Sequence, residues 1–200
     1  MNIDKIVCVG KNYLEHSKEL GDAIPEKPVL FLKPASILKQ ATHWGEMLYA
    51  SLPNQTDEIH YECEVVLRLD ANQKITAVTL GLDMTNRTIQ AKLKKNGHPW
   101  TTGKVFVDSA IIGPWTPVAD FPDYLSAPFQ FELNGEVRQA ATLKTAILQP
   151  QAILEYASSY FPLCQDDLVF TGTPVGVGSI KSGDTGRLSW NNLQFQVTWA

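Results

Sequence analysis

Two glutamates separated by one residue are the sharpest candidates for chemistry in the sequence. Glu62 and Glu64 lie in the apolar segment Ile59–Leu67, which is typical of a strand. Alternate side chains of a strand share a face, so the two carboxylates point the same way, ~7 Å apart, and His60 joins them. Carboxylates in a half-buried position repel each other, and a divalent cation relieves that repulsion. Mg²⁺ and Mn²⁺ prefer such oxygen ligands.

The spacing alone leaves a plainer interpretation open. An E-x-E pair is a weak motif, and it also suits an exposed antiparallel strand with a solvated acidic face. A third acid, Asp83, shifts the balance toward a metal site. It ends an apolar strand and precedes a helix, which is a usual place for a functional carboxylate, although simple helix capping also fits.

A histidine and a glutamate three residues apart form a second candidate group. His16 and Glu19 lie in the predicted helix Asn12–Leu20 and would face each other at that spacing. A carboxylate beside an imidazole raises its basicity and fixes its tautomer, as a general base that activates water requires. The alternative is a surface pair on a solvated helix.

A lysine and a glycine-rich loop complete the set. Lys104 follows Gly103 before an apolar run, where it would pair with carboxylates or hold an enolate. In the loop Thr171–Gly178, backbone N–H groups can approach an anion closely and Thr173 adds a hydroxyl. An ordinary surface lysine and a plain loop between strands are the alternatives.

Strands are the elements that must position these side chains. Apolar runs bounded by turn residues predict them, and Asn134-Gly135 and Asn191-Asn192 mark two hairpins. Only two or three helices are expected, with Asn12 capping the first and Pro150 in the first turn of the last. The pattern favours a β-dominated α+β fold. The predicted strands are Val7–Val9, Val29–Leu32, Ile59–Leu69, Ile75–Leu82, Phe129–Leu133, Val137–Ala140, Asp167–Phe170, Leu188–Trp190 and Phe195–Trp199. The predicted helices are Asn12–Leu20, Arg87–Lys95 and Pro150–Phe161.

Length and composition narrow the class of protein. The 200 residues predict one domain over residues 1–200. The net charge of −4 gives no basic field for nucleic acid, and the sequence has no signal peptide and no run of ~18 apolar residues, so neither nucleic acid nor membrane is expected as a partner. Three widely spaced cysteines indicate reduced thiols and a cytoplasmic protein.

The order of these segments resembles the fumarylacetoacetate hydrolase family, and in particular its short single-domain members that act as acylpyruvases, oxaloacetate decarboxylases or oxaloacetate tautomerases. The resemblance covers most of the chain. It is carried by Val9–Tyr13 with His16 and Glu19, Pro28–Pro34, His60–Glu64, Gly81–Thr85 with Arg87 and Gln90, Gly97–Trp100, Gly103–Phe106, Leu133–Glu136 and Thr171–Gly178.

The resemblance implies a fold, a cofactor and a chemistry. The fold is the family's mixed β-sandwich roll, in a homodimer. Glu62, Glu64 and Asp83 match the ligands of Mg²⁺ or Mn²⁺. Lys104, Gln90, Thr173 and Arg87 match positions at the substrate. The substrate is a small 2-oxo acid that reacts through a metal-bound enolate, by oxaloacetate tautomerisation or decarboxylation or by acylpyruvate hydrolysis. In members that cleave a C–C bond, the pair matching His16 and Glu19 sits on a lid and activates water.

Other functions remain open at this stage. A 5-carboxymethyl-2-hydroxymuconate-type isomerase or decarboxylase is the alternative within enzymes. Tyr61 and Thr88 depart from the family pattern, where some relatives have histidine and aspartate, and they motivate a catalytically idle module that binds metal and a 2-oxo acid. A partner-binding scaffold without metal is the remaining class.

Overall fold

Strands dominate the fold. Within residues 3–19, 28–53 and 56–200, which the computed structural model describes (residues 16–18 by their backbone alone), they form three sheets. The largest has the order β2-β1-β13-β6-β7-β9-β3, with β10 also paired to β7. Its strands are β1 (Lys5–Gly10), β2 (Val29–Pro34), β3 (Leu38–Gln40), β6 (Cys63–Leu69), β7 (Ile75–Asp83), β9 (Ala110–Ile112), β10 (Thr116–Pro117) and β13 (Leu168–Phe170).

Two smaller sheets complete the β structure. The five-stranded sheet has the order β12-β11-β15-β16-β4 and the three-stranded sheet the order β14-β5-β8. Their strands are β4 (Met47–Ala50), β5 (Ile59–Tyr61), β8 (Thr85–Asn86), β11 (Phe129–Leu133), β12 (Glu136–Ala141), β14 (Gly178–Ile180), β15 (Thr185–Trp190) and β16 (Leu193–Trp199). Parallel and antiparallel pairs both occur, so the β structure is mixed.

Helices are few and short. The described residues contain α1 (Leu14–Glu19), α2 (Arg87–Lys95), α3 (Thr101–Lys104) and α4 (Pro150–Ser158), with 3₁₀ turns at Ala35–Ile37 and Leu143–Thr145. Among these residues, no helix has the length and apolar character that crossing a membrane requires. The prediction of a β-dominated α+β fold is therefore confirmed.

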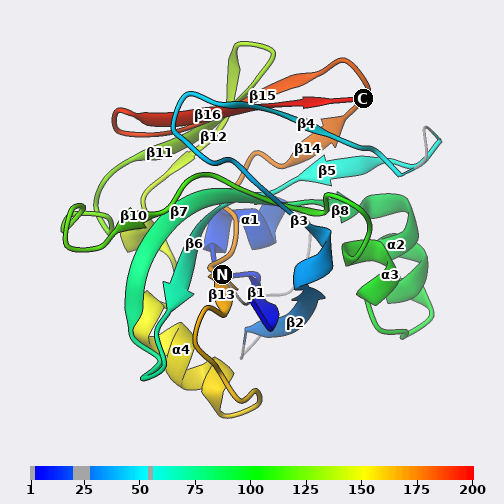
Figure 1. Ribbon diagram of the computed structural model, residues 1–200. Helices are drawn as coiled ribbons and strands as arrows, with labels where there is room; N and C mark the ends of the chain where they lie inside the picture. Colours follow the sequence, from blue (N-terminus) through cyan, green and yellow to red (C-terminus); the bar gives the residue numbers. More distant parts are fainter. Residues whose placement is uncertain (1–2, 20–27, 54–55) are drawn as a thin grey trace.

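The curled large sheet and the five-stranded sheet enclose the main core. Figure 1 shows the five-stranded sheet lying across one side of the large sheet, with α2 and α3 together beside β8 and α4 beyond the far end of β7. Phe131, Trp190 and Phe195 of the smaller sheet share one buried cluster with Val65 and Leu80 of the larger one. Alternation along β6 sends Cys63, Val65 and Leu67 into this cluster, while Glu64 projects to the other side.

The first glutamate lies where the predicted strand Ile59–Leu69 divides. The structure ends β5 at Tyr61 and begins β6 at Cys63, and the two parts belong to different sheets. Glu62 therefore occupies the junction, with its main-chain oxygen accepting a hydrogen bond from the Asp83 N–H at 2.9 Å. A continuous strand was the wrong expectation here, because sheet membership depends on distant partners that the local pattern does not reveal.

The predicted cap of the first helix has a different role. Asn12 is buried, and its side chain donates to the main-chain oxygens of Leu148 and Thr171 and accepts from the Leu148 N–H. It therefore joins the start of α1 to the segment before α4 and to the glycine-rich loop. The predicted helix Pro150–Phe161 also ends earlier, at Ser158, whereas Arg87–Lys95 is confirmed and begins after an Asn86 cap.

The glycine-rich loop contains a position that only glycine tolerates. Gly176 has φ +102°, and a Cβ there would lie 1.9 Å from the main-chain oxygen of Arg138. We expect Gly176→Ala to lower the free energy of unfolding by at least about 2 kcal/mol, since strain and a backbone clash act together. Urea denaturation measures this loss. Gly45→Ala is the matched control, because Gly45 has φ +90° with open space around it. Equal losses in the two variants would contradict the clash.

The cysteines differ sharply in accessibility. Cys8 and Cys63 are buried, and burial raises the pKa of both thiols, while Cys164 is exposed. Because the thiolate is the reactive form, we expect an aromatic disulfide reagent to modify one thiol per native chain and three in denaturant. Cys164→Ser should then abolish the native reaction. Rapid modification of a second native thiol would contradict this prediction.

Candidate metal centre

Three buried carboxylates from different elements meet at one point. Glu62 comes from the β5–β6 junction, Glu64 from β6 and Asp83 from the end of β7, and β6 and β7 are antiparallel neighbours. Each offers an oxygen within 4.8 Å of the others. The three residues are at most 7% exposed. The structure thus brings together the three acids that the sequence singles out.

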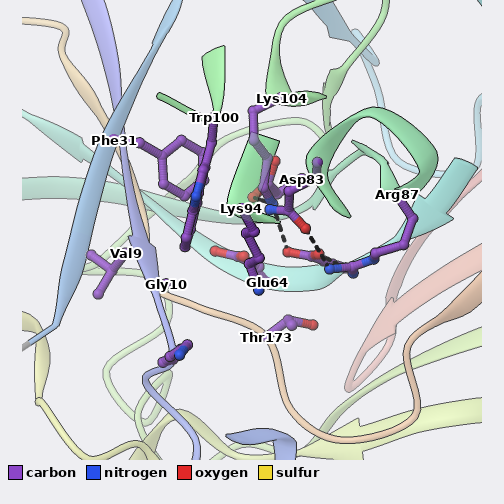
Figure 2. A pocket seen from close by; sticks show the side chains of 13 residues that line it. Val9, Gly10, Phe31, Glu64, Asp83, Arg87, Lys94, Trp100, Lys104 and Thr173 are labelled. Carbon is purple, nitrogen blue, oxygen red and sulfur yellow. Dashed lines mark hydrogen bonds and ion pairs between the residues drawn. The ribbon is translucent and has the colours of Figure 1, made fainter. Parts of the chain in front are cut away.

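Three cations surround these acids. Lys104 Nζ lies 2.9 Å from Glu62 Oε2 and 2.7 Å from Asp83 Oδ2, so it is shared by two acids. The Arg87 guanidinium donates to Glu62 Oε1 at 2.8 Å. Lys33 Nζ lies 2.6 Å from Asp83 Oδ1. Figure 2 shows Lys104 and Arg87 pointing into the same cavity as Glu64 and Asp83. Buried carboxylates need such partners, because desolvation penalises an isolated charge.

Glu64 differs from the other two acids in its partner. Its carboxylate accepts a hydrogen bond of 2.6 Å from the Gly172 N–H. Burial, followed by the like charges of Asp83 and Glu62, raises the pKa of Glu64 well above its usual value, although the Gly172 bond opposes this shift. Glu64 is therefore the acid whose negative charge is least compensated, and a bound cation would relieve it.

Lys104 remains protonated despite its burial. Burial acts to lower the pKa of this ammonium, but the charges of Asp83 and Glu62 and their hydrogen bonds outweigh it and raise the pKa above the usual value. The sequence leaves open whether Lys104 is a surface residue. The structure shows it 3% exposed at the end of the short helix α3.

The sequence predicts that a backbone N–H of the glycine-rich loop approaches an anion. In the structure the Gly172 N–H donates to the carboxylate of Glu64. The Thr173 hydroxyl next to it donates to the main-chain oxygen of Cys63 at 2.9 Å and accepts from Gln139 at 2.8 Å. Gln139 also accepts from the Cys63 N–H. Sequence reasoning missed Gln139, since it lies 76 residues from Cys63 and no local pattern marks it.

Lys33 is the second residue that sequence reasoning missed. It is 1% exposed, and besides its ion pair with Asp83 it donates hydrogen bonds to the main-chain oxygens of Met84 at 3.1 Å and Ser109 at 2.5 Å. The buried ammonium is thus held by one carboxylate and two main-chain oxygens. The available signal was its position directly after the predicted buried strand Val29–Leu32, because a buried strand seldom carries an unpaired charge.

The remaining predicted residues lie around the same cavity or beside it. Gln90 and Thr173 line it with Arg87, and Gln90 accepts a hydrogen bond of 2.8 Å from the Arg87 guanidinium. Glu19 lies on α1, and its carboxylate accepts from the Gly176 N–H at 3.1 Å. The side chain of His16 lies outside the described residues, so its pairing with Glu19 stays a prediction. His60 has another partner, Glu58 Oε1 at 2.7 Å from Nε2.

The donor set suits a hard divalent cation. Three carboxylates supply oxygen ligands, which Mg²⁺ and Mn²⁺ prefer over nitrogen and sulfur. The ammonium of Lys104 already lies between two of the acids, so their oxygens converge on positive charge. The residues present therefore fit a divalent metal site.

Comparison with known proteins identifies the family of this chain. The model of the fumarylacetoacetate (FAA) hydrolase C-terminal family matches residues 5–197. The chain is 35% identical over 193 residues to an oxaloacetate tautomerase of Escherichia coli (strain K12), covering 91% of this chain and 86% of the relative. It is 38% identical over 190 residues to a mitochondrial oxaloacetate tautomerase of Caenorhabditis elegans, covering 90% and 86%.

A solved structure shares the fold closely. The crystal structure of fumarylpyruvate hydrolase from Pseudomonas aeruginosa, in complex with Mn²⁺ and pyruvate, superimposes with a TM-score of 0.92 at 33% identity. The alignment covers 99% of this chain and 90% of that one. The family match over nearly the whole chain, together with the buried carboxylate triad, shows that the chain belongs to the fumarylacetoacetate hydrolase family of enzymes.

Proposed function

We propose that the protein catalyses oxaloacetate tautomerisation with Mg²⁺ or Mn²⁺ held by Glu62, Glu64 and Asp83. The buried triad with Lys104 shared between two of its acids is the observation that carries this proposal. The divalent cation supplies positive charge that stabilises negative charge developing on the 2-oxygen of the substrate. The oxaloacetate tautomerases among the relatives support the choice of substrate.

Polar residues of the chain would hold and orient the 2-oxo acid. Lys104 keeps its proton and places a fixed positive charge in the cavity, where it favours an enolate over a neutral ketone. Arg87 and Gln90, which bond to each other, present a guanidinium and an amide to the same cavity from α2. Thr173 also lines the cavity and lies below Glu64 in the view of Figure 2. Tautomerisation then moves one proton from C3 to the 2-oxygen, or the reverse, and needs no other reactant.

Acylpyruvate hydrolysis is the second candidate. The contact between Glu19 and the Gly176 N–H favours it, because this contact joins α1, which carries His16, to the loop that carries Thr173. In this role His16, oriented by Glu19, would take a proton from the water that attacks the 4-oxo group. Decarboxylation of oxaloacetate would pass through the same enolate.

A substrate panel with and without metal tests the proposal. Protein stripped by chelation should lose tautomerase activity, measured by the ultraviolet absorbance of the enol, and recover it with Mg²⁺ or Mn²⁺. Metal alone at the same concentration is the control for spontaneous ketonisation. Oxalate binding without turnover of oxaloacetate, acylpyruvates or hydroxymuconates would favour the idle module instead. His16→Ala should lower hydrolysis and spare tautomerisation, and unchanged hydrolysis would contradict the role of His16.

A further inference from the structure

Strand β12 buries a glutamine and exposes its valine. Gln139 is 1% exposed and Val137 is 56% exposed, although side chains two residues apart in a regular strand share a face. The pairing of β12 with β11 skips Arg138, which is therefore the extra residue of a β-bulge. A bulge re-aims the neighbouring side chain, and bulges are common beside active sites. This bulge turns the polar Gln139 inward, where burial of its amide costs free energy unless the amide is hydrogen-bonded.

The inward amide of Gln139 links strand β6 to the glycine-rich loop. Its oxygen accepts a hydrogen bond of 2.9 Å from the Cys63 N–H, and its nitrogen donates to the Thr173 hydroxyl and to the main-chain oxygen of Pro174, both at 2.8 Å. The first partner can only donate and the last can only accept, so together they fix the direction of the amide. The Thr173 hydroxyl must then accept from Gln139, and its own hydrogen points to the main-chain oxygen of Cys63 at 2.9 Å.

Both ends of this hydrogen-bond network adjoin the metal triad. Cys63 lies between Glu62 and Glu64 in the chain, so a shift of its peptide would move both carboxylates. Thr173 follows Gly172, whose N–H donates to the Glu64 carboxylate at 2.6 Å. The glutamine therefore fixes the main chain on two sides of Glu64, through the strand that carries this acid and through the loop that bonds to it. It acts on the carboxylates through these neighbours.

We propose that Gln139 is a positioning residue of the metal centre, which holds Glu62 and Glu64 at the separation that a divalent cation requires. This inference rests on the proposed function, because it takes the triad to be the metal site. An apolar side chain would fill the same position without the cost of burying an amide. The advantage of glutamine here thus lies in its hydrogen bonds to the strand and to the loop.

The Mn²⁺ affinity of the stripped protein, measured by calorimetric titration without substrate, tests this role. Gln139→Met keeps the length of the side chain and removes its hydrogen-bonding groups, so the Kd for Mn²⁺ should rise about 10–100-fold. Circular dichroism at the titration temperature verifies that the variant is folded. A Kd within about twofold of the parent's would overturn the inference. A parent protein that binds no Mn²⁺ would instead reject the proposed function.

Replacements of Thr173 test the same network from the loop. Thr173→Ser keeps the hydroxyl and should retain the parent's Kd for Mn²⁺. Thr173→Val keeps the shape but loses the bonds to Cys63 and Gln139, so it should raise the Kd. Because both residues belong to one network, Gln139→Met should raise the Kd less in the Thr173→Val variant than in the parent. Equal Kd values for Thr173→Ser and Thr173→Val would overturn the inference, even if Gln139→Met fails to fold.

Gln149→Met is the matched control for the loss of a glutamine amide. The Gln149 nitrogen donates to three main-chain oxygens ahead of α4, at 3.1 to 3.3 Å, which are those of Leu143, Lys144 and Ala146. Its loss should lower Tm and leave the Kd for Mn²⁺ within about twofold of the parent's. If the two glutamine variants weaken Mn²⁺ binding equally, the effect is one of general stability, and Gln139 has no positioning role.

Discussion

Replacing Glu64 with glutamine is expected to lower the affinity for Mg²⁺ or Mn²⁺ by at least about 100-fold, because changes to residues that merely support metal ligands already cost about 10–100-fold. Glutamine keeps the shape and the acceptor for the Gly172 N–H but loses the charge. Tautomerase activity should fall together with the affinity for the metal. Calorimetric titration of metal into the stripped protein measures the affinity, and enol absorbance measures the activity.

The stability of the Glu64→Gln variant distinguishes the loss of a metal ligand from misfolding. Since burial and the charges of Asp83 and Glu62 raise the pKa of Glu64, the folded protein disfavours its ionised form at neutral pH. Glu64→Gln should therefore be at least as stable as the parent in chelator, yet gain no Tm when Mn²⁺ is added. Glu58→Gln is the matched control, because Glu58 pairs with His60 and lies outside the triad. An Mn²⁺-dependent rise in Tm equal to the parent's would contradict the assignment of Glu64.

Local sequence patterns predict those features of the structure that residues close together in the chain determine. Asn134 and Gly135 have φ of +53° and +83° between β11 and β12, as their hairpin signal requires. Helix α2 has the predicted bounds because its cap and its end signals are local. The three acids of the metal site could also be named, since two share a strand pattern and the third ends the next strand.

Contacts between distant segments escape this reasoning. Lys33 meets Asp83 across 50 residues, and Gln139 meets Cys63 across 76, so neither partner is visible in the local sequence. Asn12 suits a helix cap by type, but its side-chain amide donates instead to the main-chain oxygens of Leu148 and Thr171. The single domain over residues 1–200, the homodimer and the cytoplasmic location stay predictions.

Loss of Lys33 is expected to have the largest effect on folding. Lys33→Met keeps much of the side-chain length and removes the charge, leaving Asp83 Oδ1 without this cation and the main-chain oxygens of Met84 and Ser109 without this donor. Breaking a buried ion pair by removing one partner costs about 3–5 kcal/mol. Urea denaturation in chelator should show this loss. Metal affinity should also fall about 10–100-fold, because Lys33 orients a proposed ligand.

A double-mutant cycle distinguishes the ion pair from general packing. Lys33→Met is expected to lower the free energy of unfolding because it leaves the Asp83 carboxylate uncompensated. In that case, Asp83→Asn should lower the free energy of unfolding less in the Lys33→Met variant than in the parent. Lys39→Met is the control, because the Lys39–Asp108 pair is longer, at 3.2 Å, and Lys39 is 32% exposed in its side chain. Its loss should cost less than about 1 kcal/mol. Additive effects of Lys33→Met and Asp83→Asn would contradict the pairing, and would assign the stability of this position to the lysine's contacts with Met84 and Ser109 instead.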